Sequence, residues 1–294
     1  MSRRPKVWLI DGHYQIFRAY YSMPDLRAPD GAPIGALRGY ASTLIKFLRE
    51  EQPTHAGVAW DHAMTSFRNE LWSGYKAGRT EAPDDLEPQF ALCAEVTRAL
   101  GLPVYSLERF EADDVIATMT RKLLAKGADV VIVTADKDLG VLVSDRVRLY
   151  DLKKQESQGP EELRVRMGVP PERITEFLAL VGDAVDNVPG VPGIGAKTGA
   201  ALLNHFGALT DIPSDFDDWK ELELRGKRRA FDCLAAGSEE LELSRRLVEL
   251  QRDLPVDVKL RELQYRGARR EPLEQLLGRL GADALLERVT RFAS

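Results

Sequence analysis

Nine acidic residues of this 294-residue chain stand where a predicted strand ends or a predicted helix begins. Carboxylates gathered in one folded site repel each other unless cations neutralise them. Oxygen ligands of this kind suit Mg²⁺ or Mn²⁺, and such ions are the usual helpers in phosphodiester chemistry. The sequence therefore predicts a metal centre that contains Asp11, Asp61, Glu111, Asp113, Asp114, Asp136, Asp138, Asp183 and Asp186.

Three of these acids follow apolar stretches that we predict as buried strands, at residues 7–10, 55–60 and 129–134. A further strand is expected at 147–152, and helical patterns lie at 14–21, 37–48, 86–100 and 111–125. Strands that alternate with helices imply an α/β fold with a mostly parallel central sheet flanked by helices. Ligands of such sheets bind beyond the carboxyl ends of the strands, so Asp11, Asp61 and Asp136 should converge at that edge.

The other acids stand at helix or turn boundaries. Glu111, Asp113 and Asp114 open a helix, where residues three apart share a face. Helix capping is the alternative there, because acids in a first turn favour the helix dipole. The pairs Asp136/Asp138 and Asp183/Asp186, taken alone, are also typical of turns and caps. The recurrence of acids at so many boundaries favours a metal site over separate solvated acids.

A glycine-rich hairpin spans residues 189–199, between predicted helices at 174–181 and 200–206. It is not a P-loop, because Ala196 stands between the last glycine and Lys197, and its glycine spacing does not fit a dinucleotide fingerprint. Such a hairpin can aim backbone N–H groups and a helix N-terminus at a phosphate. A plain interhelical turn is the alternative, and the Gly-Ile-Gly-x-Lys-Thr pattern favours the phosphate interpretation.

The segment 62–85 is the least regular part of the first half and mixes aromatic and basic residues. Aromatic side chains there could stack on a nucleobase, while Arg68, Lys76 and Arg79 could meet phosphates. The same mixture also occurs in ordinary amphipathic helices. A second basic run at 225–229 is by default a solvated surface.

Composition narrows the class of protein. Hydrophobic residues make up 44% and charged residues 30%, as in soluble globular proteins, and no apolar run approaches the roughly 20 residues of a membrane span. The N-terminus lacks the apolar region of a signal peptide, and the two cysteines show no zinc spacing, so we expect a cytoplasmic protein without zinc. The net charge is −5, but without the nine acids the remaining chain is basic, so acidity does not exclude DNA.

The ordered motifs of the chain resemble those of the 5′-nuclease (flap endonuclease) superfamily, most closely the 5′→3′ exonuclease domains at the N-terminus of bacterial DNA polymerase I. The resemblance runs from about residue 7 to about residue 260. It implies a PIN-like α/β catalytic region over 1–155, with a helical arch at about 62–88. It also implies a helical DNA-binding region over 156–294, with a helix–three-turn–helix at about 174–207. Its motifs are Leu9–Gly12, Ser66–Arg68, Gly74–Arg79, Glu111–Val115, Thr134–Leu139 and Gly182–Gly190.

The resemblance also implies roles for single residues. Lys76 and Arg79 would steady the scissile phosphate, and Tyr75 would stack on a base near the cleaved bond. One metal would be held by Asp11, Asp61, Glu111 and Asp113, a second by Asp136, Asp138, Asp183 and Asp186, with Asp114 between them. The hairpin, through Gly193, Gly195, Lys197 and Thr198, would bind duplex backbone and hold a potassium ion. Arg18 and Tyr20 match positions near the site.

The implied function is a metal-dependent 5′→3′ exonuclease and 5′-flap endonuclease of DNA replication and repair, using two Mg²⁺ or Mn²⁺ ions. Its partners would be DNA with 5′ ends, nicks or flaps, and a DNA polymerase; we expect a monomer. One rival is a DNA-structure-binding relative without catalysis. Another is a phosphatase with an aspartyl nucleophile, which expects an acid two residues after Asp11, where His13 stands. A standalone enzyme and a fragment of a longer polymerase both remain open.

Overall fold

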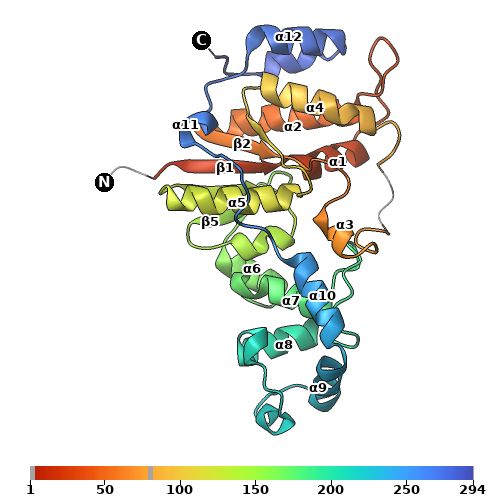
Figure 1. The fold of residues 1–294 in the computed structure, drawn as a ribbon. Helices are drawn as coiled ribbons and strands as arrows, with labels where there is room; N and C mark the ends of the chain where they lie inside the picture. The colour runs from red at the N-terminus through yellow and green to blue at the C-terminus, as the bar shows by residue number, and fades with distance from the viewer. Residues whose placement is uncertain (1–3, 79–81, 294) are drawn as a thin grey trace.

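The computed structural model describes residues 4–78 and 82–293, and a six-stranded sheet lies at its centre (Figure 1). The strand order is β3-β2-β1-β4-β5-β6. All neighbouring pairs are parallel except β5 and β6, which are antiparallel. The strands are β1 (Lys6–Asp11), β2 (His55–Ala59), β3 (Val104–Tyr105), β4 (Asp129–Val133), β5 (Val147–Asp151) and β6 (Glu156–Gln158).

The helices supply the layers around this sheet. The α-helices are α1 (Gly12–Ser22), α2 (Gly35–Glu51), α3 (Phe67–Leu71), α4 (Glu87–Ala99), α5 (Ala112–Ala125), α6 (Pro160–Met167), α7 (Ile174–Val181), α8 (Ala196–Phe206), α9 (Lys227–Ala236), α10 (Ser238–Val248), α11 (Leu260–Leu263) and α12 (Arg270–Arg279). Short 3₁₀ helices are η1 (Asp138–Leu142), η2 (Pro171–Arg173), η3 (Leu209–Asp211), η4 (Phe216–Trp219) and η5 (Asp283–Arg288).

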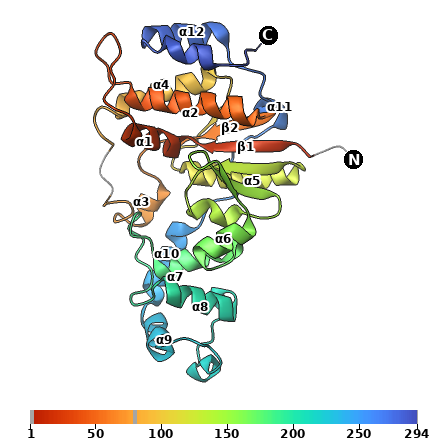
Figure 2. The ribbon, with the colours of Figure 1, turned by 180° about the vertical axis from the view of Figure 1, so that it is seen from behind.

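The two faces of the sheet pack against different helices because side chains alternate along each strand. In β1, Trp8 and Ile10 belong to the apolar core shared with α1, α2, α4 and α12. Val7 and Leu9 point the other way, into the core shared with α5 and the helices that follow β6. Figures 1 and 2 show α2 and α4 on one side of the sheet and α5 on the other.

The strand order places a topological switch point at β1. From β1 the chain moves through α1 and α2 to β2 on one side, and it returns through α5 to β4 on the other side. The loops that leave β1 and β4 therefore diverge and open a crevice at the carboxyl edge. Asp11 is the last residue of β1, and Thr134 to Asp136 follow β4 directly.

A helical lobe built from α6 to α10 extends beyond α5 (Figure 1). Within it α7 packs on both α8 and α10. The chain then leaves the lobe and returns to the α/β part: α11 contacts β2, α12 contacts α4, and η5 contacts α2. These last residues depart from the expectation of one helical DNA-binding region over 156–294, because leucines of α12 complete the core behind the sheet.

Other differences from the sequence-based prediction are local. β3 and β6 have only two and three residues, too short for a strand pattern, and β6 lies beyond the expected boundary at 155. α8 begins at Ala196, four residues before its predicted start. The expected helical arch holds α3 and a run of turns in its described part.

No helix in the described ranges is long and apolar enough to cross a membrane.

Candidate functional site

Asp11 ends β1 and caps α1 at the carboxyl edge of the sheet. Its carboxylate accepts hydrogen bonds from the backbone N–H of Tyr14 at 3.1 Å and from Oγ1 of Thr134 at 3.1 Å. Burial raises the pKa of Asp11 to about 7, helped by repulsion from Asp61 and Asp136 and opposed by these hydrogen bonds. Acids from three separate segments therefore face one another here, as the fold predicts.

Asp61 follows β2 and is held between α1 and α5. Its Oδ1 accepts from the N–H of Ala112 at 2.6 Å, and its own N–H donates to Nδ1 of His13 at 3.0 Å. His13 is buried and stacks on Phe90 with ring centroids 5.0 Å apart. Burial lowers the pKa of His13 even though Asp61 is near, so a neutral imidazole orients this loop.

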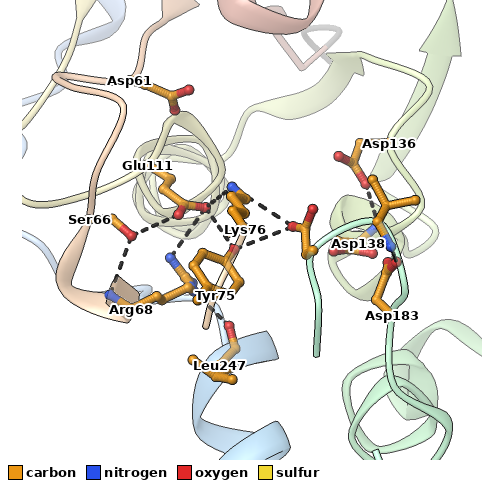
Figure 3. A network of polar contacts seen from close by, with 12 residues as sticks. Asp61, Ser66, Arg68, Tyr75, Lys76, Glu111, Asp136, Asp138, Asp183 and Leu247 are labelled. Atoms are coloured by element: carbon orange, nitrogen blue, oxygen red, sulfur yellow. Dashed lines mark hydrogen bonds and ion pairs between the residues drawn. The ribbon is translucent and has the colours of Figure 1, made fainter. Parts of the chain in front are cut away.

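Glu111 caps α5 and is neutralised by basic side chains of the chain itself (Figure 3). One oxygen accepts from Oγ of Ser66 at 2.7 Å, and the other accepts from Nζ of Lys76 at 2.9 Å and from the Tyr75 hydroxyl at 3.3 Å. Burial alone would raise its pKa, but Lys76, Arg68 and the hydrogen bonds outweigh burial and lower the pKa to about 2.

Asp114 departs from the predicted ligand set. It is fully buried, and Arg68 binds both of its oxygens, at 2.7 and 2.8 Å. The N–H groups of Glu111 and Gln251 donate to the same two oxygens at 3.2 and 2.9 Å. With both oxygens engaged, Asp114 has no lone pair directed at a metal. In this conformation Asp114 is engaged within the fold, and its role as a metal ligand stays a prediction.

Arg68 is likewise engaged within the fold. We expected it to meet DNA phosphates, but it is only 2% exposed. Besides Asp114 it donates to the backbone carbonyls of Leu247 at 2.7 Å and Glu249 at 2.9 Å. Arg68 thus joins the arch, α5 and the C-terminal end of α10, and it positions the acids at the start of α5.

Asp113 lies between the two groups of acids. Its pKa is raised well above the ordinary value, first by burial and then by repulsion from Asp136, Asp11 and Glu111. The Asp113 carboxylate thus lies within electrostatic reach of both groups of acids.

Asp136 and Asp138 form the second group with the loop after α7. Asp136 accepts from the N–H of Asp138 at 2.9 Å, and its own N–H donates to Thr134 Oγ1 at 3.1 Å. Asp138 is mostly buried, and its Oδ1 has no hydrogen-bond partner among the described residues. Burial and then repulsion from Asp136, Asp183 and Asp186 raise the pKa of Asp138 to about 7.

Asp183 and Asp186 face these acids from the turn after α7. Asp183 pairs with Nζ of Lys137 at 2.7 Å and accepts from the N–H of Val185 at 2.8 Å. Burial opposes these contacts, yet they lower the pKa of Asp183. Asp186 lies 3.4 Å from the Tyr75 hydroxyl and 3.8 Å from Nζ of Lys76. Figure 3 shows Lys76 between Glu111 and the acids Asp136, Asp138 and Asp183.

The donor set fits divalent cations in its chemistry. Divalent cations prefer hard carboxylate oxygens as ligands. They would offset the repulsion among these acids and supply a partner for Oδ1 of Asp138. As the side chains stand, no three acidic, histidine or cysteine groups in ranges 4–78 and 82–293 are close enough to hold one ion. Lys76 and Lys137 pair with Glu111 and Asp183, so ligation requires these side chains to shift.

The residues predicted to act from the arch differ in where their side chains lie. Tyr75 is only 4% exposed, packs with Val188 and Leu247, and cannot stack on a base in this conformation. Lys76 has a positive φ of 56° and points its ammonium group into the acids. Arg79 lies outside the described residues.

Arg18 and Tyr20 lie on α1 but do not reach the acids directly. Tyr20 donates its hydroxyl to Asp85 at 2.8 Å, and Arg18 donates to Oε1 of Gln15 at 3.5 Å. Neither of these contacts is to a predicted metal ligand, and the DNA contacts of Arg18 and Tyr20 stay predictions.

The glycine hairpin connects α7 to α8 and leaves an exposed helix start. Val191 and Ile194 are buried and anchor the hairpin to the lobe, whereas Gly193, Gly195 and Lys197 are exposed. Gly190 has φ 63°, and a Cβ there would lie 2.4 Å from the Gly182 nitrogen, so a side chain is excluded. Since α8 begins at Ala196, Lys197 and Thr198 stand in its first turn, where N–H groups are directed outward.

Several residues that the site uses were not predicted as site residues. His13, Ser66, Thr134 and Lys137 each contact a candidate ligand. Ser66 could have been found from its N-cap position before α3, and Lys137 from its place between two acids. Nothing in the local pattern singles out Thr134.

Comparison with known proteins accounts for nearly the whole chain. Residues 6–168 match the 5′–3′ exonuclease N-terminal resolvase-like domain, and residues 169–271 match the 5′–3′ exonuclease C-terminal SAM fold. The solved T5 D15 protein, co-crystallised with metal ions, has a similar fold: TM-score 0.69, 21% identity, covering 96% of this chain and 99% of that one.

Two curated relatives show how the chain compares in length. DNA polymerase I of Rhizobium leguminosarum is 43% identical over 88% of this chain, which spans only 26% of the polymerase. The 5′–3′ exonuclease of Aquifex aeolicus (strain VF5) is 32% identical over 97% of this chain and 96% of its own length. With both family domains matched in order and a relative of equal length, the chain belongs to the 5′–3′ exonuclease family.

Proposed function

We propose that the chain hydrolyses DNA phosphodiester bonds from 5′ ends and at 5′ flaps, with two divalent cations, Mg²⁺ or Mn²⁺, held by its carboxylates. The observation that carries this proposal is Asp138, a mostly buried acid with a partnerless oxygen and a pKa raised to about 7 among three other acids. The family and the exonuclease of equal length support the reaction class. The metal ions that accompany the T5 D15 protein support the cofactor class.

The ligands that we propose are the eight acids other than Asp114. Asp11, Asp61, Glu111 and Asp113 form the group at β1, β2 and α5, and Asp136, Asp138, Asp183 and Asp186 form the group at β4 and α7. Divalent cations, when bound, would activate a water for attack and stabilise the leaving oxygen. No serine or cysteine nucleophile is required.

The chain's own residues would bind and orient the substrate. Lys76 already points at Glu111 and Asp186, so a scissile phosphate arriving among cations would compete for its ammonium group. We propose that Lys76 then turns from the carboxylates to the phosphate, with Arg79 beside it. Tyr75 would have to leave its buried place to stack on a base.

The helical lobe would bind the duplex. The exposed N–H groups at the start of α8, with Lys197 and Thr198, form a site for backbone phosphate. A potassium ion at the hairpin, a monomeric state, a cytoplasmic location and a DNA polymerase partner complete the proposal.

The test is a labelled 5′-flap duplex and a labelled blunt duplex, each incubated with the full chain in Mg²⁺ or in EDTA, with product lengths resolved. We expect metal-dependent cutting near the flap junction and short 5′ products from the blunt end. Binding of the flap without cutting in Mg²⁺ or Mn²⁺ would favour the non-catalytic rival.

A further inference from the structure

A basic cavity of about 360 Å³ lies between α1, α2 and η5, on the face of the sheet opposite α5 and the helical lobe. None of the described residues that line it is acidic. Its polar lining consists of three arginines and four uncharged polar residues, and the argument uses Gln15, Arg18, Arg38, Ser42, Thr43 and Arg288.

The three guanidinium groups lack counter-ions. Among residues 4–78 and 82–293, none of Arg18, Arg38 and Arg288 forms an ion pair. Arg288 donates to Oγ of Ser42 at 2.9 Å, and Arg18 donates weakly to Gln15 at 3.5 Å. All three arginines are partly buried, so water screens their repulsion only in part. Three unpaired positive charges around one cavity call for an anion.

Gln15 points to a ligand independently of these charges. It is only 2% exposed, and its Nε2 has no hydrogen-bond partner among the described residues. Its Oε1 accepts from Arg18, so the amide nitrogen of this cavity-lining residue is the donor left without an acceptor among the described residues. A buried donor without an acceptor costs free energy, and an oxyanion in the cavity would supply that acceptor.

We propose that this cavity binds a phosphate group. Guanidinium forks pair with phosphate oxygens through two parallel hydrogen bonds, and the hydroxyls of Ser42 and Thr43 can donate to the same group. The volume exceeds that of one phosphate and leaves room for an attached sugar. The phosphate can belong to a DNA strand or to a free small anion.

Position favours a DNA strand. Arg18 lies seven residues after Asp11 on the helix that Asp11 caps, which is about 10 Å along the axis. The hairpin lies in the lobe beyond α5, on the other side of the sheet (Figure 1). A DNA strand bound at both the cavity and the hairpin would run past the acids. The choice of DNA as the source of the phosphate rests on the proposed function.

The test compares Arg38→Gln/Arg288→Gln with Arg164→Gln/Arg279→Gln, which removes two exposed, ion-paired charges elsewhere. Binding of a labelled nicked duplex is measured in EDTA over a salt series. We expect the cavity variant to bind about tenfold more weakly, with the slope of log affinity against log salt smaller by about 1. Arg38→Lys should keep the slope, and circular dichroism checks that each variant is folded.

A second arm titrates inorganic phosphate at constant ionic strength and follows the melting temperature. If the cavity variant changes the salt slope of DNA binding, the proposal is supported with a DNA phosphate as the ligand. If the variant keeps the slope but its melting temperature no longer responds to inorganic phosphate, the proposal is supported with a free anion as the ligand. If the cavity variant matches the control in both arms, the proposal is overturned. Cleavage is not measured here, so that failure would leave the nuclease proposal standing.

Discussion

Glu111 and Asp138 are both mostly buried acids of one site, yet their surroundings differ. Glu111 is paired with Lys76, approached by Arg68 and hydrogen-bonded by Ser66, and its pKa is lowered to about 2 despite burial. Asp138 is surrounded by three acids, and burial with their repulsion raises its pKa to about 7. The protein thus neutralises Glu111 with its own side chains and leaves Asp138 in need of a cation.

This difference separates acids that hold the fold from acids that we propose as metal ligands. Asp114 is the extreme of the first kind, because Arg68 and two N–H groups engage both of its oxygens. Asp138 is the extreme of the second kind, because one of its buried oxygens has no partner among the described residues. Substitutions at the two extremes should therefore affect different properties.

The largest effect is expected from Asp138→Ala. Cleavage of a 5′-flap substrate in Mg²⁺ should be abolished, because the second group loses its central oxygen ligand, while flap binding stays nearly intact. Asp145→Ala removes an exposed acid just before β5, at the opposite edge of the sheet, and should cleave as the wild type does. Unchanged turnover of the Asp138 variant would remove Asp138 from the site.

Arg68→Met should act on the fold instead. It leaves Asp114 as an unpaired buried charge, which typically costs about 3–5 kcal/mol of unfolding free energy. Urea denaturation measures this cost. The double variant Arg68→Met/Asp114→Leu should recover much of the loss, because no buried charge remains; a double variant as unstable as the single one would contradict the pairing.

The pH dependence of stability should follow the buried acids whose pKa is raised. The pKa of Asp11 and Asp138 is raised to about 7 from 3.8, so the metal-free folded state keeps protons that the unfolded chain releases. Their contribution to the unfolding free energy is complete below about pH 4 and is lost as pH rises through about 7. In EDTA the melting temperature should fall from pH 5 to pH 8, by less in Asp138→Asn than in Asp145→Asn. Equal falls would contradict the raised pKa.

The smallest effect is expected from Ser66→Ala. Its hydroxyl caps α3 at the N–H of Arg68 and donates to Glu111. Loss of such a cap lowers the unfolding free energy by about 1 kcal/mol. Part of this loss comes from the hydrogen bond to the Glu111 carboxylate. Ser238→Ala, an exposed serine at the start of α10, serves as the control in the same denaturation measurement.

The sequence predicts the sheet and most of the site because both follow from regular patterns. Apolar runs that end in Asp11 and Asp61 are enough to place these acids at one edge. The pattern does not predict that Arg68 is buried, because its partners Asp114, Leu247 and Glu249 lie 46 to 181 residues away. Nor does it predict that α11, α12 and η5 return to the α/β part, since leucine-rich helices look alike wherever they pack.

The most direct test of the difference between Asp114 and Asp138 is to count the metal ions that each variant binds. Isothermal titration of the metal-free chain with Mn²⁺ should give two ions for the wild type and for Asp145→Asn. Asp138→Asn should lose one ion or bind it far more weakly, whereas Asp114→Asn, where it folds, should keep both. Two ions bound by Asp138→Asn with wild-type affinity would contradict the claim that Asp138, whose Oδ1 has no hydrogen-bond partner among the described residues, holds metal.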